Sequence, residues 1–258
     1  MQEVSGMSER EWALRVQLAA AYRIIDHLGW SELIWTHTTV RVPGPEHHFL
    51  INPYGKLFSE ICASNLVKID MEGRLVAGQP KQEFNPAGFV IHSAIHTSRP
   101  DAKCVMHTHT MAGMAVAALK CGLLPISMYA LGFYESVAYH DFEGPSTDVG
   151  ERRRIAENLG SFHAMIMRTH GLLVCGETVG QAFVRMYRLE RSCQVQLAAQ
   201  AARSELIAPD RNVCEISREK SDAFLSTEEN SGWYSKVANP EFDAMMRLMD
   251  KKDPSYRL

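Results

Sequence analysis

The chain has 258 residues, a length that suits one large domain or two small ones and allows a full hydrophobic core. Its 46% hydrophobic and 22% charged residues are ordinary for a globular protein, and a net charge of -3 excludes a strongly basic, nucleic-acid-binding surface. The first residues lack the apolar core of a signal peptide, and no later stretch is apolar enough to span a bilayer. We therefore expect a cytoplasmic protein whose partners include neither nucleic acid nor membrane.

The cysteines also indicate a cytoplasmic protein. The six residues form no CxxC pair and stand mostly among apolar neighbours. We expect them to be buried, reduced thiols, and their spacing argues against a zinc finger.

The N-terminal part predicts a helix followed by short strands. Residues 8–28 have helical periodicity, Ser8 and Glu11 have the spacing of a capping box, and Gly29 suits a C-cap. Residues 33–43 and 47–55 are rich in β-branched and aromatic residues and predict strands. Residues 59–76 predict one or two helical turns, then a strand, a turn and another strand.

Helices and strands alternate from there on, which predicts a single layered α/β domain over residues 1–205. The expected order is a helix at 88–98, a strand at 102–109, a helix at 110–122, a strand at 135–142, a helix at 148–160, strands at 162–171 and 172–176, and a long helix at 179–205. The tail, residues 206–258, is more polar and contains a helix-like segment at 240–253. We expect it to pack on the core or on a neighbouring subunit.

Histidines at the ends of two expected strands form a candidate metal site. In "HTH", His107 and His109 project to the same side of an extended strand. His170, in "RTHG", follows a second apolar strand. If the two strand ends meet, the three imidazoles make a site with an open position, as in catalytic zinc centres. A rival pair, His92 and His96, is spaced four apart on an expected helix and fits second-shell partners better.

These motifs resemble the class II aldolase/adducin family. The resemblance rests on "HSAIHTSRPDAKCVMHTHT" together with "RTHGLLVCGET" and extends from about residue 10 to about residue 200. It implies a three-layer αβα domain with a central, largely antiparallel mixed sheet of nine strands. It also implies a homotetramer with active sites at subunit interfaces, and a divalent metal, zinc or alternatively manganese, bound by His107, His109 and His170.

The departures from the aldolase pattern argue against the usual sugar-phosphate cleavage. Gly88 stands where these aldolases have a catalytic glutamate, and Pro86 and Ala87 replace a phosphate-binding serine pair. His37 replaces an asparagine of the phosphate site. Several segments, such as "GWSELIWTHTTVRVP", instead resemble the adducin head domain, which is regarded as a non-catalytic scaffold. The short tail lacks the lysine-rich character of adducin tails and favours a free-standing bacterial relative.

We therefore expect a metal-dependent carbon–carbon lyase that acts on a small, non-phosphorylated hydroxy or keto acid, as a decarboxylase or an aldolase. The alternative is a non-catalytic, adducin-like assembly module with a vestigial metal site. Tyr129 falls where family aldolases place a tyrosine that donates a proton into a neighbour's site, although a buried structural ring is the other interpretation. His37 and Glu60 are the remaining catalytic candidates, and Glu60 can equally cap the helix that follows it.

Overall fold

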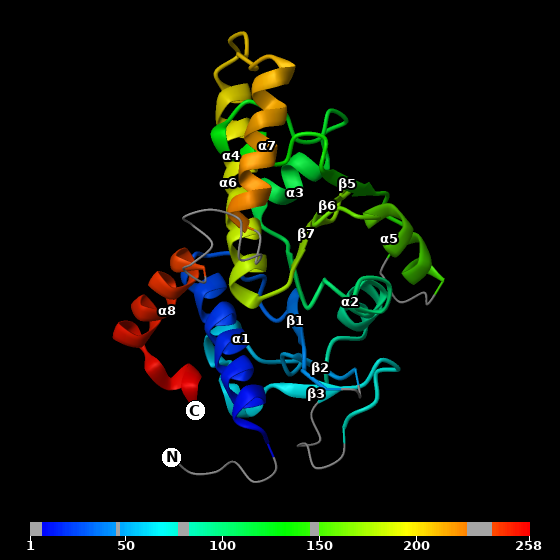
Figure 1. Ribbon diagram of the computed structural model, residues 1–258, viewed down its shortest axis with the longest axis vertical. Coiled ribbons are helices and arrows are strands. Elements are labelled where there is room, and N and C mark those ends of the chain that lie inside the picture. Colours follow the sequence, from blue (N-terminus) through cyan, green and yellow to red (C-terminus); the bar gives the residue numbers. More distant parts are fainter. Residues whose placement is uncertain (1–6, 45–46, 77–82, 145–149, 226–238) are drawn as a thin grey trace.

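A computed structural model describes residues 7–44, 47–76, 83–144, 150–225 and 239–258. Within these ranges seven strands form one sheet, in the spatial order β3-β2-β1-β4-β7-β6-β5 (Figure 1). All neighbours are antiparallel except β5 and β6. The strands are β1 (His37–Arg41), β2 (Phe49–Ile51), β3 (Val67–Ile69), β4 (Cys104–Thr108), β5 (Val137–His140), β6 (Ala164–Met167) and β7 (Gly171–Gly176). The expected mixed, largely antiparallel sheet is confirmed, with seven described strands where the resemblance implied nine.

Helices cover both faces of this sheet and complete three layers (Figure 1). One face carries α1 (Glu9–His27) and α6 (Val179–Ala201), with α8 (Pro240–Lys252) packed against these two helices, and the other face carries α2 (Pro86–Ser98) and α5 (Glu151–Leu159). Successive side chains of a strand point to opposite faces, so β4 contributes to both cores. Cys104 and Met106 join the core beneath α1 and α6, whereas Val105 joins the core beneath α2 and α5. The predicted α/β architecture is therefore confirmed.

The first helix begins where the sequence indicated. Ser8 precedes α1 and its hydroxyl accepts a hydrogen bond from the Glu11 backbone N–H at 3.1 Å. Glu11 does not complete the capping box, because its carboxylate is bound to Arg15 at 3.1 Å and to Lys68 at 2.8 Å. Gly29 follows the helix with a φ of 71°, a conformation that suits glycine at a helix end.

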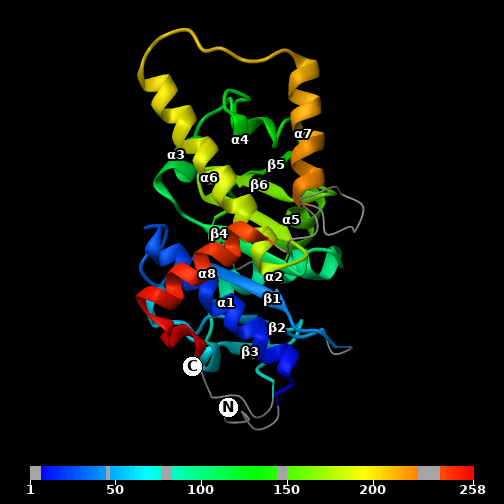
Figure 2. The same cartoon turned by 60° about the vertical axis from the view of Figure 1, so that its left-hand side comes forward.

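The tail contains a helix that the sequence did not predict, α7 (Arg211–Leu225). Its apolar residues are separated by charged ones, and only Cys214 and Leu225 are buried. The short helices α3 (Met111–Ala117) and α4 (Met128–Leu131) lie earlier in the chain, and α4 contacts both α6 and α7 (Figure 2). The described end of the tail packs on the same chain, since α8 contacts α1 and α6 and the Tyr256 ring is fully buried.

The six cysteines are unpaired, as expected. Four are buried, but Cys121 is exposed and Cys62 is only partly covered, so the expectation of burial is wrong at these positions. Across the described ranges no helix is both long and apolar enough to cross a bilayer.

Candidate metal centre

The three predicted histidines converge at one end of the sheet. His107 lies in β4, His109 follows the end of that strand, and His170 stands in the turn between β6 and β7. His107 Nε2 is 2.8 Å from His109 Nε2, and one nitrogen from each of the three rings lies within 4.8 Å of the others. Within the described ranges this is the single group of three or more histidine, cysteine or carboxylate side chains close enough to share an ion.

Strand pairing and one glycine bring His170 to the other two. β4 pairs with β7, and Thr108 is opposite Leu172, so the start of β7 lies beside the end of β4. A Cβ on Gly171 would collide with the Thr108 carbonyl and lie 3.1 Å from His109 Cδ2. The two strand ends can therefore approach this closely only because residue 171 has no side chain.

The hydrogen bonding and burial of the cluster suit a cation. His107 Nδ1 is 2.9 Å from the Leu172 carbonyl and must donate to it, which leaves the lone pair of Nε2 for a metal. Burial lowers the pKa of His107 and His109, and it lowers the pKa of His170 to about 4. All three rings are thus neutral at neutral pH, the state in which imidazole binds divalent ions.

Thr110, just after β4, links the end of that strand to α6. Its hydroxyl accepts a hydrogen bond from the Gly113 N–H and so caps α3. The same hydroxyl donates to the carboxylate of Glu190, which is buried on α6. Nothing in the sequence predicts this pair beyond the position of Thr110 at the start of an expected helix.

His37 lies beside the cluster on β1, where it is the pairing partner of His107. Its ring centre is 5.4 Å from that of His107 and 4.3 Å from that of His92. Neither ring nitrogen has a hydrogen-bond partner among the described residues, and burial lowers the pKa of His37 to about 3. A Cβ on Gly88 would lie 2.8 Å from His37 Cγ, so the imidazole occupies the space that a side chain at position 88 would need.

The rival pair, His92 and His96, is joined by a hydroxyl rather than arranged around a metal. Thr39 Oγ1 is 2.7 Å from both His92 Nδ1 and His96 Nε2, and His96 Nδ1 is 2.9 Å from the Ala102 carbonyl. His96 Nδ1 must donate to that carbonyl, so Thr39 donates to His96 and in turn accepts from His92. The rings are held in fixed tautomers, and His92 lies next to His37 rather than being hydrogen-bonded to one of the three clustered histidines.

A cavity of about 350 Å³ opens over the cluster. Its lining includes Trp35, Thr36, His37, Phe142 and Thr169 as well as the three clustered histidines. Thr36 and Thr169 have φ values of 66° and 53°, which β-branched residues rarely adopt. Backbone strain of this kind concentrates where function fixes the geometry.

The other two catalytic candidates lie outside this lining. Tyr129 is on α4, with the Arg188 guanidinium 5.9 Å from its ring centre. The Glu60 carboxylate is exposed, accepts a hydrogen bond from the Leu57 N–H at 2.8 Å and lies 3.7 Å from Lys56 Nζ. Glu60 thus caps the start of the short 3-10 helix Phe58–Glu60, in which it is the last residue, and not the helix that follows it as the sequence suggested.

Fold and site together define a layered α/β protein with a three-histidine site of the kind that binds divalent cations. The family described as the class II aldolase and adducin N-terminal domain matches residues 16–197, so the chain belongs to this family.

Relatives within this family carry names that imply different functions. A crystal structure of an aldolase II superfamily protein from Pseudomonas syringae is 43% identical, with a TM-score of 0.88 and 98% of each chain covered. An L-fuculose 1-phosphate aldolase from Glaciozyma antarctica is 31% identical, with a TM-score of 0.80, 100% of this chain and 97% of that chain covered. Rat alpha-adducin is 42% identical over 245 residues, which are 93% of this chain but 33% of that protein.

Proposed function

We propose that the protein is a metal-dependent carbon–carbon lyase that acts on a small, non-phosphorylated hydroxy or keto acid, by decarboxylation or aldol cleavage. The observation that supports it is the convergence of three neutral imidazoles, His107, His109 and His170, on one cavity. Zinc is the expected ion and manganese the alternative. The protein is proposed to act in the cytoplasm as a homotetramer.

The composition of the cavity favours a substrate without phosphate. No lysine or arginine occurs among the described residues that line it, and its volume of about 350 Å³ suits a small acid. A phosphate group would carry up to two charges into this space without a matching cation from the chain. When bound, a divalent metal supplies the Lewis acidity that polarises substrate oxygens and takes up developing charge.

Other side chains around the cluster are proposed to bind the substrate and to exclude water. His37 is neutral at neutral pH and can donate one N–H to the substrate while accepting at its other ring nitrogen. Trp35 and Phe142 provide apolar walls that keep water from the reacting carbon.

Tyr129 is proposed as the proton donor. Because it lies outside the cavity of its own chain, this role requires a second copy of the chain, which fits the proposed homotetramer. A catalytic role for Glu60 stays a prediction from the sequence, and the described contacts of Glu60 favour a role as a helix cap.

Two other functions have support among the relatives. The 42% identity with alpha-adducin supports a non-catalytic assembly module. The 31% identity with the L-fuculose 1-phosphate aldolase from Glaciozyma antarctica supports cleavage of a sugar phosphate. Against the latter, position 88 is glycine and the space beside it is filled by His37.

A substrate screen separates these possibilities. Zinc- and manganese-loaded protein is incubated with hydroxy acids, keto acids and L-fuculose 1-phosphate, and release of CO₂ and of aldehyde is measured in parallel. The proposal expects turnover of at least one non-phosphorylated acid, abolished in His170→Ala. Turnover of the sugar phosphate alone would contradict it, and metal binding without any turnover would favour the assembly module.

A further inference from the structure

A second cavity is separate from the one over the histidine cluster, and we call it the α6–α7 cavity after two of the helices that line it. Its volume is about 430 Å³, and the remaining walls come from the loop before β6, the turn after α4 and Glu177, which lies between β7 and α6. Ala164, which starts β6, lines it, whereas His170 follows the opposite end of the same strand. The linings of the two cavities share no residue, so the α6–α7 cavity is a separate candidate site.

A buried guanidinium faces this cavity. Arg185, on α6, is 7% exposed, and its Nη1 donates to the Cys175 carbonyl at 2.6 Å and to Gln181 Oε1 at 3.3 Å. Nε and Nη2 have no hydrogen-bond partner among the described residues. Burial lowers the pKa of Arg185, although nearby acidic groups oppose this effect. A buried cation with unused donors is costly unless an anion or water satisfies it.

The charged side chains of the lining balance one another, but a further cation lies beside them. It contains the cations Arg185 and Arg218 and the carboxylates Glu177 and Asp222. The Glu177 carboxylate is 3.7 Å from the ammonium group of Lys103, which lies outside the lining. Asp222 has no ion pair within the described part of the chain, and burial raises its pKa. Counted together with Lys103, three cations stand in or beside the lining against two carboxylates, which leaves an excess of one positive charge.

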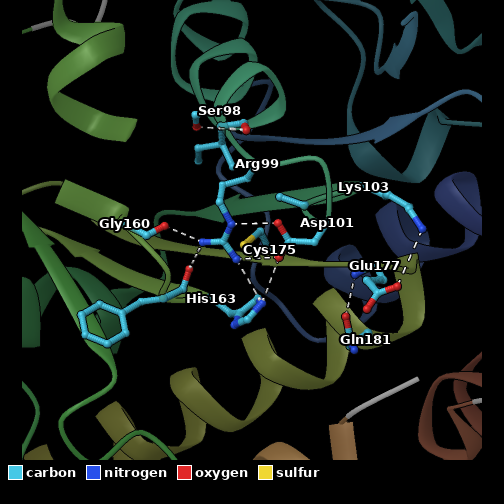
Figure 3. Close-up of polar contacts among 12 residues, drawn as sticks. Ser98, Arg99, Asp101, Lys103, Gly160, His163, Cys175, Glu177 and Gln181 are labelled. Atoms are coloured by element: carbon cyan, nitrogen blue, oxygen red, sulfur yellow. Dashed lines mark hydrogen bonds and ion pairs between the residues drawn. The ribbon is translucent and has the colours of Figure 1, made fainter. Parts of the chain in front are cut away.

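The loop before β6, which forms one wall of the α6–α7 cavity, is held in place by Arg99, as Figure 3 shows. Arg99 Nη1 donates to the Gly160 carbonyl at 2.6 Å and to the Phe162 carbonyl at 2.9 Å, while Nη2 binds Asp101 at 2.6 Å. His163, at the end of this loop, lies 3.2 Å from Arg99 Nη2 and lines the cavity. Burial lowers the pKa of His163 to about 4, so its ring is neutral. The loop is thus fixed before any ligand arrives.

We propose that the α6–α7 cavity binds a small metabolite through a carboxylate or phosphate group held by Arg185 and Arg218. The planar guanidinium donates paired hydrogen bonds to either oxyanion. Such a group would satisfy the unused donors of Arg185 and balance the excess positive charge that Lys103 brings to the surroundings of the lining. Ser136 and Ser221 line the same space and offer hydroxyl groups to the rest of the ligand. The cavity has the size of ordinary small-molecule sites.

Calorimetric titration with inorganic phosphate and with malonate tests this site and separates the two oxyanions. Because a metal centre also attracts anions, the titration uses both the wild type and the His107→Ala/His109→Ala/His170→Ala variant. At least one probe should bind both proteins with a Kd below about 1 mM. Arg218→Gln should weaken this binding about tenfold or more. Arg211→Gln, which removes the same charge from an exposed position on the same helix, should leave it unchanged.

Three results would overturn the proposal. The first is the absence of binding of either probe to the wild type. The second is binding that disappears in the folded triple-histidine variant, which would place the anion at the metal centre. The third is wild-type affinity in Arg218→Gln. Arg218 is only partly buried and has no hydrogen bond or ion pair in the described ranges, so this variant should fold even if Arg185→Gln does not.

Discussion

Replacing Gly88 with alanine should destabilise the protein through a collision with His37. The new Cβ would lie 2.8 Å from His37 Cγ and Nδ1 and 2.9 Å from Cδ2. The imidazole is 3% exposed and its centre is 4.3 Å from that of His92, so it has little room to retreat. Overpacking of this kind costs about 1–3 kcal/mol, offset by up to about 1 kcal/mol because alanine is favoured over glycine in a helix.

Gly88→Ala should stabilise the protein, rather than destabilise it, once the His37 imidazole is removed. In a His37→Ala background the space beside residue 88 is open, and only the helical preference for alanine remains. Gly88→Ala should then stabilise α2 by up to about 1 kcal/mol. The coupling energy between the two positions, about 1–3 kcal/mol, equals the cost of the collision.

Thermal unfolding of the wild type, both single variants and the double variant measures this coupling. The four proteins are compared with a chelator present and at one protein concentration, because bound metal and subunit association both shift the midpoint. For a chain of this size, each kcal/mol corresponds to about 2–4 °C. If Gly88→Ala changes the stability equally in both backgrounds, to within about 0.5 kcal/mol, the argument that His37 fills this space is refuted.

Three further predictions concern the surroundings of the cluster. In the metal-free protein, the free energy of unfolding should fall as the pH drops from about 6.5 toward 3. Burial lowers the pKa of His96 to about 3, so between these pH values His96 is protonated in the unfolded chain but stays neutral in the folded one. Urea midpoints at several pH values check this, and a midpoint that stays constant or rises on acidification would contradict it. Gly171→Ala should weaken zinc binding at least about tenfold in competition with a coloured chelator, since the new methyl group displaces the strand ends that carry the ligands, and unchanged affinity would be inconsistent with that geometry. Thr110→Val should lower the free energy of unfolding by about 2–3 kcal/mol, because α3 loses its cap and the buried Glu190 loses a donor; a loss below about 0.5 kcal/mol in denaturant titrations would speak against it.

The histidine cluster could be foreseen because it depends on local patterns at two strand ends. The alternation in "HTH" and the glycine after His170 are visible in the sequence, and the family resemblance then joins the two motifs. The helices with strong periodicity were also predicted to within a few residues, as α1 and α6 illustrate. The α7 helix was missed because charged residues interrupt its apolar positions.

Contacts between distant strands and helices could not be derived from the sequence. The pairing of His37 with His107 depends on the register of β1 against β4, and the bond from Thr110 to Glu190 joins residues 80 positions apart. Single-chain patterns likewise do not place Tyr129 relative to a second subunit. Local patterns identify which side chains carry chemistry, whereas the packing of the sheet decides which of them meet.

Elemental analysis of the purified protein tests the central claim most directly. The wild type and the His107→Ala/His109→Ala/His170→Ala variant are measured after chelation and after reloading with zinc or manganese. The account predicts about one divalent ion per chain in the reloaded wild type and none in the variant, with both proteins folded by circular dichroism. No uptake by the wild type, or equal uptake by the variant, would contradict a metal site at these histidines.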